Sequence, residues 1–342
     1  ESIYNEGIEI NSMMEKARRA IAGLLGVQAS DIIFTSGSSE SNTSAIKGVC
    51  FANPNKKHII TTNVEHSSIM NCCRQMEEVF GYRVTYLPVD STGKVSLKQV
   101  QDAMDEDTAI VSIMYVNNES GAINPINEIS EYVKKKTHAY MHVDLTQSIG
   151  KVPLDMTNID LASISAHKLE GLKGSGILVK KSFVPYVPLI NGGEQEFGIR
   201  GGTSNALVDM MFAKTLRLAL ENGKKYHAYI QEMHDRLIAG LKSIDGVEIN
   251  SPADAIASTI NFSYENIPSE VMQNALNEGG FMVSARSTCD SKSMNPSYVL
   301  EAMGFSKKRA SSCIRVSLSY HNTLEEVDRF IEVLKGVIQQ YG

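Results

Sequence analysis

Short apolar runs alternate with amphipathic stretches through the first two thirds of the chain. The runs are rich in Val, Ile and Thr, which is typical of buried strands. We expect strands at 31–35, 58–62, 82–88, 108–116, 139–143, 160–165 and 175–179. The stretches between most of them predict helices around 67–79, 96–104 and 126–136. This alternation predicts an α/β domain, with helices flanking a mostly parallel sheet.

The pattern changes after Thr203. A helix is predicted over about 203–221, ended by Asn222-Gly223, and a second over 226–243. Strands near 247–250, 257–263 and 281–284, a helix at 268–278 and a capped C-terminal helix from Thr323 follow. At the other end, the capping box Ser12-Met-Met-Glu15 predicts a helix start. We therefore expect a large α/β domain at 12–221 and a smaller α+β domain that contains 222–342 together with residues 1–11.

Composition narrows the class of protein. The 342 residues leave room for about two domains, and the net charge of −6 argues against a nucleic-acid surface. No apolar stretch approaches the roughly 20 residues of a membrane span, so we expect a soluble protein. The chain starts at Glu1 without a methionine, which is compatible with a native start upstream. The five cysteines form neither a disulfide framework nor metal-ligand spacing, which indicates a reducing, cytoplasmic compartment and no metal.

Two strand ends carry the most suggestive polar residues. Asp144 ends one apolar run, and Lys168 follows another in Ser165-Ala166-His167-Lys168. A lysine there can hold pyridoxal phosphate as a Schiff base, while an aspartate keeps the ring nitrogen protonated. An Asp–Lys ion pair at the edge of the sheet explains the same residues, so the pair alone does not decide.

Several other residues are candidates for a ligand site. The turn Ser36-Gly37-Ser38-Ser39 lies between a strand and a helix and suits a phosphate, although such turns also cap helices. Arg200-Gly201-Gly202-Thr203 is a similar turn before the long helix. His66 follows a strand and is either a helix cap or a residue that stacks on an aromatic ring. Asn118 follows the strand at 108–116, where either a site or an ordinary turn is expected.

Arg315 and Cys289 add two more candidates. Arg315 interrupts an apolar strand and needs an anion, which is either a structural carboxylate or a substrate carboxylate. Cys289 lies in a polar stretch and is a candidate reactive thiol, whereas Cys50 and Cys313 lie in apolar runs.

The combination of motifs resembles the cysteine desulfurases, class V members of the fold-type I pyridoxal-phosphate enzymes. The resemblance covers essentially the whole chain. Its motifs are Phe34-Thr-Ser-Gly-Ser-Ser-Glu-Ser41, Glu65-His66, Val116-Asn-Asn-Glu119, Val143-Asp144-x-x-Gln147, Ser165-x-His167-Lys168, Arg200-x-Gly202-Thr203, Cys289, Pro296-Ser-Tyr-Val-Leu300 and Ile314-Arg315-x-Ser317-Leu318.

This resemblance implies a pyridoxal-phosphate transferase fold with a seven-stranded type of sheet, and a role for each candidate. Lys168 is expected to bind the cofactor and shuttle the Cα proton, Asp144 to pair with the ring nitrogen, and His66 to stack on the ring. The resemblance further implies the cofactor contacts of Asn118 and Gln147 (ring oxygen), Ser38, Ser39, Ser165 and His167 (phosphate) and Thr203 (the partner subunit's site). Arg315, with Asn118, is expected to bind the carboxylate of L-cysteine. Cys289 is expected to take the sulfur as a persulfide and leave alanine.

The implied assembly is a homodimer with a shared site that passes sulfur to an acceptor protein, either an iron–sulfur scaffold or a tRNA-thiolating enzyme, without direct contact to nucleic acid or membrane. A selenocysteine lyase, a class V aminotransferase and a cofactor-binding sulfur-transfer scaffold with little turnover remain alternatives. Some positions depart from the family pattern. Glu194 and Phe197 replace glycine and arginine, Arg286 precedes the cysteine in an unusual loop, and the family's N-terminal strand lies outside the sequence.

Overall fold

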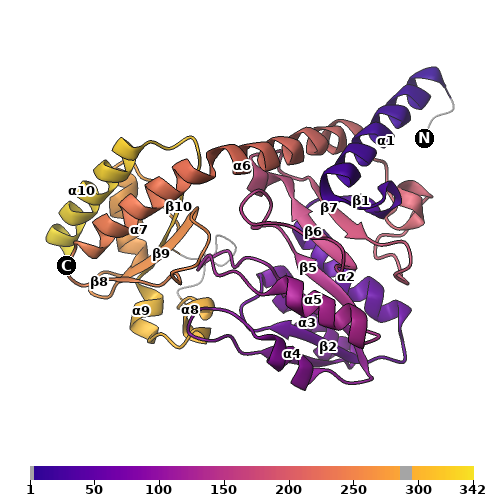
Figure 1. Cartoon of the computed structure of the whole chain (residues 1–342), viewed down its shortest axis with the longest axis horizontal. Coiled ribbons are helices and arrows are strands. Elements are labelled where there is room, and N and C mark those ends of the chain that lie inside the picture. The colour runs from indigo at the N-terminus through magenta and orange to yellow at the C-terminus, as the bar shows by residue number, and fades with distance from the viewer. Residues whose placement is uncertain (1–3, 286–294) are drawn as a thin grey trace. The chain divides into compact units, whose positions relative to one another are not determined.

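The computed structural model describes residues 4–285 and 295–342 of the chain (Figure 1). It divides into two compact units. The first unit comprises Glu1–Leu87, Ser96–Tyr115 and Pro125–Glu221. The second comprises Pro88–Val95, Val116–Asn124 and Asn222–Gly342. Of the residues 1–11 expected in the small domain, the described ones (4–11) group with the first unit, because residues from Asn5 onward are part of that unit's first helix.

A seven-stranded sheet forms the centre of the first unit, in the order β1-β7-β6-β5-β4-β2-β3. The strands β2 to β6 pair in parallel, and β7 is antiparallel to both of its neighbours. Their bounds are β1 Ile32–Thr35, β2 His58–Thr62, β3 Arg83–Leu87, β4 Thr108–Met114, β5 Tyr140–Asp144, β6 Leu161–Ser165 and β7 Gly176–Lys180. The expected mostly parallel sheet is thus confirmed.

Helices cover both faces of this sheet (Figure 1). The helix α2 packs across β4 to β7 with α3 beside it, and α5 packs on β5 from the other face. A core of buried apolar residues, including Ile46, Val49 and Ile69, fills the space between α2, α3 and the strands. The bounds are α1 Asn5–Leu25, α2 Ser38–Ala52, α3 Ser67–Phe80, α4 Leu97–Ala103 and α5 Ile126–Lys136, with short 3₁₀ helices at η1 Ala29–Asp31, η2 Ala166–Leu169 and η3 Gln195–Gly198.

Two expected helix ends are wrong. The helix α1 begins at Asn5, so Ser12 lies inside it rather than at its start. The helix α6 runs without interruption over Ala206–Lys242 and contains Asn222 and Gly223. A glycine inside a helix costs only about 1 kcal/mol. Buried apolar residues on both sides of it, such as Phe212 and Leu237, stabilise a continuous helix.

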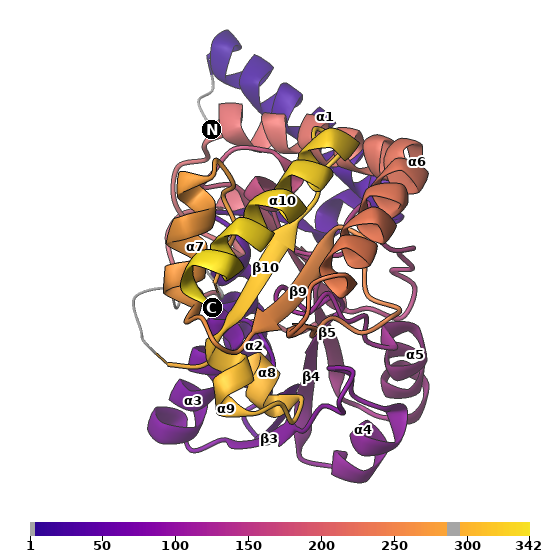
Figure 2. The same cartoon turned by 90° about the vertical axis from the view of Figure 1, so that its left-hand side faces the viewer.

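A three-stranded antiparallel sheet, in the order β10-β9-β8, forms the second unit (Figure 2). The helices α7 and α10 and residues 222–242 of α6 pack on it around Leu237, Phe262 and Phe330. The strand expected at 281–284 is reduced to one bridge between Ser284 and Arg315. The bounds are β8 Val247–Ile249, β9 Thr259–Tyr264, β10 Cys313–Ser317, α7 Ser269–Glu278, α8 Tyr298–Ala302, α9 Lys307–Ser311 and α10 Leu324–Tyr341.

Candidate functional site

Asp144 ends β5 in the middle of the sheet, where it pairs with Met114 of β4 and Ser163 of β6. Its side chain is only 5% exposed. The backbone N–H of Thr146 donates to Oδ1 at 2.9 Å, and Nδ2 of Asn42 donates to Oδ2 at 2.8 Å. Each carboxylate oxygen keeps a second lone pair, so the carboxylate is held in one orientation and can still accept a proton donor.

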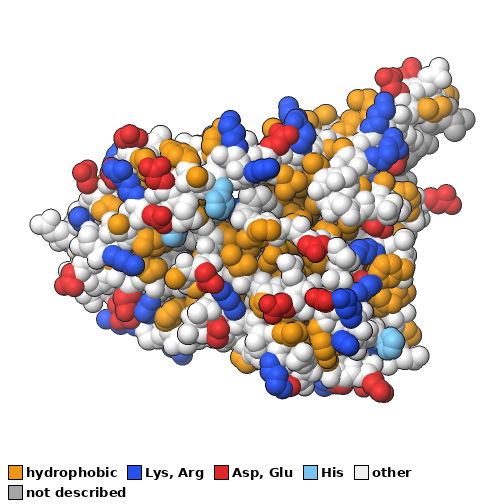
Figure 3. All heavy atoms as spheres, viewed as in Figure 1, with side chains coloured by type: hydrophobic (Ala, Val, Ile, Leu, Met, Phe, Trp, Pro, Cys, Tyr) orange, Lys and Arg blue, Asp and Glu red, His pale blue; other side chains and the backbone are white. Residues whose placement is uncertain are grey.

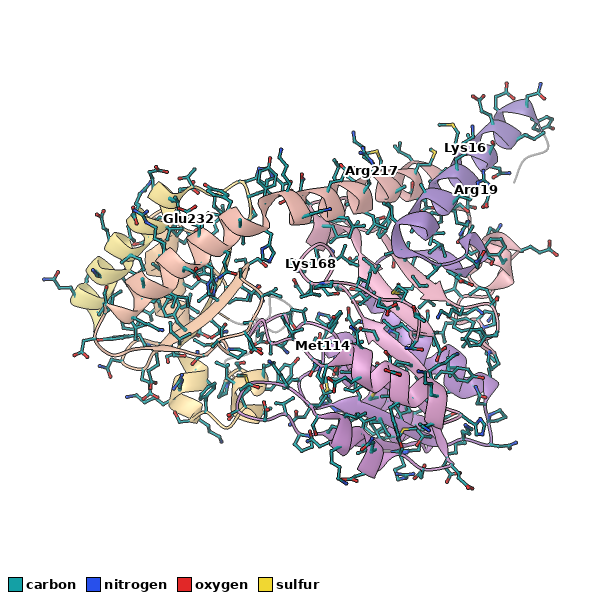
Figure 4. The ribbon with its side chains drawn as sticks, viewed as in Figure 1. Lys16, Arg19, Met114, Lys168, Arg217 and Glu232 are labelled. Atoms are coloured by element: carbon teal, nitrogen blue, oxygen red, sulfur yellow. The ribbon has the colours of Figure 1, made fainter. Side chains whose placement is uncertain are left out.

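Lys168 lies in η2, immediately after β6 ends at Ser165. Figure 4 shows it at the same end of the sheet as Met114, the last residue of β4. Glu170 ends η2 with a positive φ of 63°, and the N–H of Gly171 returns to the carbonyl of Ala166 at 2.9 Å. This tight turn presents Lys168 as an exposed side chain at the carboxyl edge of the sheet, where ligands of parallel sheets bind.

A polar cradle forms where the turn before α2 meets the end of β6. Gly37 precedes α2, and a Cβ atom on Gly176 of β7 would lie 2.6 Å from the Gly37 Cα atom. Ser165, the partner of Gly176 across the sheet, hydrogen-bonds His167 through Oγ and Nδ1 at 2.8 Å. The first N–H groups of α2, near Ser38 and Ser39, have no acceptor within their own helix, and a Cβ on Gly37 would lie 3.6 Å from Oγ of Ser165. A helix start beside this hydroxyl is a suitable site for a phosphate.

Charge interactions show that His66, His167 and Lys168 gather in this unit. Partial burial lowers the pKa of His167, and the charges of Lys168, Lys173 and His66 lower it further. His66 caps α3, and its Nδ1 accepts from the N–H of Ser68 at 3.2 Å. His66 is thus the helix cap that the sequence left open, and it lies close enough to His167 for their charges to interact.

Gln147 and Thr203 have less defined surroundings. Gln147 is half-buried after β5, and its Oε1 accepts from Nζ of Lys151 at 3.0 Å. Thr203 is exposed in the segment between η3 and α6. An exposed Thr203 is compatible with a contact outside its own chain.

Two buried titratable groups near Asp144 had no role assigned from sequence. Burial raises the pKa of Glu65 to about 8, and the Asp144 carboxylate adds to this, while hydrogen bonds from Met114 and Thr62 oppose it. Burial also lowers the pKa of His142 to about 4. Its ring nitrogens bond the hydroxyls of Ser112 and Ser163 at 2.8 and 2.9 Å, which ties β4, β5 and β6 together beneath Asp144.

A buried ion pair holds the segment that leads to Thr203. Arg18 of α1 donates from Nη1 and Nη2 to Glu196 of η3 at 2.8 and 2.9 Å, and the N–H of Phe34 donates to the same carboxylate at 2.8 Å. Glu196 and Phe197 both have positive φ angles, 48° and 60°. Because Glu196 must point inward to reach Arg18, this strained backbone is held in place. The apolar periodicity of α1 gave no sign that Arg18 is buried.

Asn118 and Arg315 belong to the second unit. Nη1 of Arg315 donates to the carbonyl of Asn118 at 2.8 Å, and Nη2 donates to Oγ of Ser284 at 3.1 Å. Its Nε and the Oδ1 of Asn118 are buried with no partner among the described residues. Burial lowers the pKa of Arg315, and Glu119 opposes the shift. A donor without a partner suits a carboxylate ligand.

Cys289 and Arg286 lie outside the described residues. The other four cysteines are all buried. Burial raises the pKa of Cys72 to about 11 and that of Cys50 and Cys73 further. The Cys313 thiol donates to the carbonyl of Ala285 at 3.0 Å. A protonated, buried thiol is a poor nucleophile, so none of these four is suited to attack a substrate.

Within residues 4–285 and 295–342, no group of three or more His, Cys, Asp or Glu side chains could hold a metal ion. No helix in that part of the chain is long and apolar enough to cross a membrane.

The residues of the first unit fit the pyridoxal phosphate expected from sequence. Thr146 beside Asp144 and Ser175 before β7 each have a buried hydroxyl without a partner in the described structure, as residues facing an absent polar ligand do. Asp144, Lys168 and the α2 cradle supply an acceptor for a ring nitrogen, an amine for an aldehyde and donors for a phosphate.

Comparisons with known proteins find close relatives. Residues 1–330 match the family described as Aminotransferase class-V. The protein "Cysteine desulfurase IscS" of Methanosarcina thermophila is 40% identical over 343 residues, which cover 99% of this chain and 84% of that protein. The solved structure of a "NIFS-LIKE PROTEIN" is 37% identical with a TM-score of 0.93, covering 99% of this chain and 91% of that one. A structure described as "SspA in complex with cysteine" is 32% identical with a TM-score of 0.81, covering 93% and 89%.

Proposed function

The chain belongs to the aminotransferase class-V family, among the cysteine desulfurases, and from this premise we propose that it converts L-cysteine to L-alanine and takes the sulfur as a persulfide on Cys289. One observation carries the proposal. Asp144 ends β5, Lys168 follows the end of the adjacent parallel strand β6, and Ser165, which hydrogen-bonds His167, lies against the turn that starts α2. The alternative explanation, a structural ion pair between Asp144 and Lys168, does not account for the phosphate-binding cradle beside these residues.

Pyridoxal phosphate is the cofactor we assign to this site. When bound, its protonated ring withdraws electrons from the substrate Cα. Asp144 holds the proton on the ring nitrogen, and Lys168 carries a proton to and from Cα. Further cofactor contacts are made by His66 (ring face), Gln147 and Asn118 (ring oxygen), Ser38, Ser39, Ser165 and His167 (phosphate) and Thr203 (the partner subunit's site).

Arg315 and Asn118 are assigned to the substrate carboxylate. The orientation of Arg315 is set by the Asn118 carbonyl and the Ser284 hydroxyl. Its unpartnered Nε is left to donate to a carboxylate oxygen. A relative whose structure contains cysteine is 32% identical to this chain, which supports an amino acid of that size.

Cys289 is assigned as the nucleophile because burial keeps the other thiols protonated or enclosed. Its thiolate attacks the sulfur of the bound substrate and forms an S–S bond. The Cβ–S bond breaks, and Cβ keeps the bonding electron pair and takes up a proton. Alanine therefore leaves, and the terminal sulfur of the persulfide passes to an acceptor protein, an iron–sulfur scaffold or a tRNA-thiolating enzyme.

A homodimer is the assembly we propose. Apolar side chains are exposed on α1, on η3 and at the start of α6: Tyr4 74%, Ile8 57%, Phe197 55% and Leu207 68%. Figure 3 shows hydrophobic side chains among the charged ones on α1, at the upper right. Exposed apolar residues in this number indicate a protein–protein interface. The exposed Thr203, close in sequence to Leu207, is then available to the other subunit.

The test is a two-product assay. The protein is purified with pyridoxal phosphate, L-cysteine and dithiothreitol are added, and sulfide and alanine are measured together. Equal amounts of both are expected, because dithiothreitol reduces the persulfide to sulfide. Pyruvate or amino-group transfer without sulfide favours an aminotransferase, and bound cofactor without any product favours a sulfur-transfer scaffold. Rates with L-selenocysteine separate a selenocysteine lyase from a desulfurase.

Three variants assign the residues. Lys168→Ala is expected to lose the visible absorbance of lysine-bound pyridoxal phosphate, and Cys289→Ser to keep it but release no sulfide. Cys72→Ser is the matched control and is expected to release sulfide at the wild-type rate, since that thiol is buried. Sulfide release by Cys289→Ser at the wild-type rate would show that another group accepts the sulfur.

A further inference from the structure

Asn42 is a fully buried polar residue in the second turn of α2, to which neither the sequence motifs nor the proposed function gives a role. Its Nδ2 donates to Oδ2 of Asp144 at 2.8 Å and to Oγ of Ser68 at 3.0 Å. Its Oδ1 is buried with no partner in the described part of the chain. Both donor hydrogens of the amide are therefore used, at the cost of an unsatisfied acceptor, which indicates a specific requirement at this position.

The second contact continues to His66. Oγ of Ser68 lies 2.8 Å from Nδ1 of His66, and the backbone N–H of Ser68 also donates to Nδ1 at 3.2 Å. A ring nitrogen that accepts from an N–H carries a lone pair, so the proton of the neutral ring is on Nε2. Since Ser68 accepts from Asn42, its own hydroxyl hydrogen is free to donate to Nδ1.

We propose that Asn42 is a positioning residue that couples the two groups which act on the cofactor ring, Asp144 and His66. On one side it fixes the plane of the Asp144 carboxylate together with the N–H of Thr146. On the other side it orients the Ser68 hydroxyl, which joins the Ser68 N–H in stabilising the Nε2–H tautomer of His66. The role rests on the proposed function, because Asp144 and His66 are assigned to pyridoxal phosphate there.

A continuous chain of four side chains supports this coupling, and every link is a hydrogen bond of normal length. The groups at its ends come from different elements, β5 and the start of α3, and Asn42 on α2 is the residue that bridges them. Low local polarity strengthens such a network and makes the loss of one member costly to the others. A change at Asn42 should therefore alter both ends, whereas a change at Ser68 should alter only His66.

The first measurement needs no turnover. With ¹⁵N-labelled histidine, ring nitrogen chemical shifts distinguish the Nδ1–H and Nε2–H tautomers, and His66→Gln identifies the His66 signals. The cofactor-loaded wild type is expected to show Nε2–H only. Ser68→Ala and Asn42→Ala are expected to add a fraction of the Nδ1–H tautomer, because Nδ1 loses the well-oriented hydroxyl donor and keeps the longer bond from the backbone N–H of residue 68, at 3.2 Å. A single unchanged tautomer in both folded variants would overturn the proposal.

The second measurement follows the Asp144 side. Bound pyridoxal phosphate is titrated by absorbance against pH. Asn42→Ala is expected to shift the midpoint and to lower kcat at least tenfold, with KM for L-cysteine within about twofold of wild type. Ser68→Ala is expected to keep the wild-type midpoint. A wild-type midpoint in Asn42→Ala would overturn the proposal, and so would equal shifts in the two variants.

Asn53→Ala provides the matched control. It removes the same side chain at the other end of the same helix, where Nδ2 donates only to the carbonyl of Val49 at 2.8 Å. It is expected to leave the tautomer, the midpoint and kcat unchanged. If Asn42→Ala does not fold, Asn42→Leu, which keeps the size of the side chain but removes both donors, replaces it in both measurements. If the wild type binds the cofactor but makes no sulfide, the proposed function fails while the tautomer result stands by itself.

Discussion

Replacing Arg18 with methionine tests the buried ion pair that holds the segment before Thr203. Arg18 is 3% exposed and donates two hydrogen bonds to Glu196. Its guanidinium also lies 4.7 Å from the ring centre of Phe34 and 4.9 Å from that of Phe197. Methionine keeps most of the apolar contact but removes the charge and every donor.

The expected loss is about 3–5 kcal/mol of unfolding free energy, the usual cost of leaving one member of a buried pair without its partner. The Glu196 carboxylate then keeps only the N–H of Phe34 as a donor. The substitution also destabilises the ionised form of Asp209. Burial and the charge of Glu196 raise the pKa of Asp209 to about 7, and Arg18 is one of the cations that oppose this shift. In the double variant Arg18→Met/Glu196→Gln the buried Glu196 charge is removed together with its partner, so we expect it to be more stable than Arg18→Met.

Urea unfolding at pH 7, followed by far-UV circular dichroism, measures these differences. The exposed pair between Arg217 and Glu221 provides the control, and Arg217→Met is expected to change the midpoint little. The reasoning is refuted if Arg18→Met loses less than about 1 kcal/mol, well below the loss expected for a buried pair. It is also refuted if the double variant is less stable than Arg18→Met.

Three further predictions follow from single contacts. Burial raises the folded-state pKa of Glu65 to about 8, so the wild type should lose stability as pH rises from about 4.5 through 8. Glu65→Gln should lack this loss. Equal pH slopes of the two proteins in urea unfolding between pH 5 and 9 would contradict the prediction. The Cβ of Gly176→Ala should displace the turn at Gly37 and weaken pyridoxal-phosphate binding at least tenfold in a fluorescence titration. Gly23→Ala, whose Cβ has open space around it, is the control and should bind the cofactor normally. Wild-type affinity in Gly176→Ala would show that the turn adapts. Arg315→Lys replaces a planar guanidinium, whose separate nitrogens reach Asn118 and Ser284 and leave Nε for a carboxylate, with one ammonium nitrogen. KM for L-cysteine should therefore rise at least tenfold in the sulfide assay, and an unchanged KM would remove Arg315 from the substrate site.

The strands and most helices could be predicted from the sequence because apolar runs and capping residues are local signals. Every expected strand of the large sheet forms, and β5 ends at Asp144 as its polarity indicated. The predicted helix break at Asn222-Gly223 is wrong, because buried apolar residues before and after it stabilise the helix more than one glycine destabilises it. Residues 4–11 group with the first unit for a similar reason, since contacts between distant segments decide which unit a terminal segment joins.

The sequence by itself predicted the chemistry, through a family resemblance whose motifs include Asp144, Lys168 and Cys289. Only the tertiary structure decided how Asp144 and the segment before Thr203 are held. The contacts of Asn42 with Asp144 and Ser68, and of Arg18 with Glu196, join residues 26 to 178 positions apart. Hydrogen bonds across such distances leave no periodic trace in the chain. They form only when the sheet has brought its strand ends together.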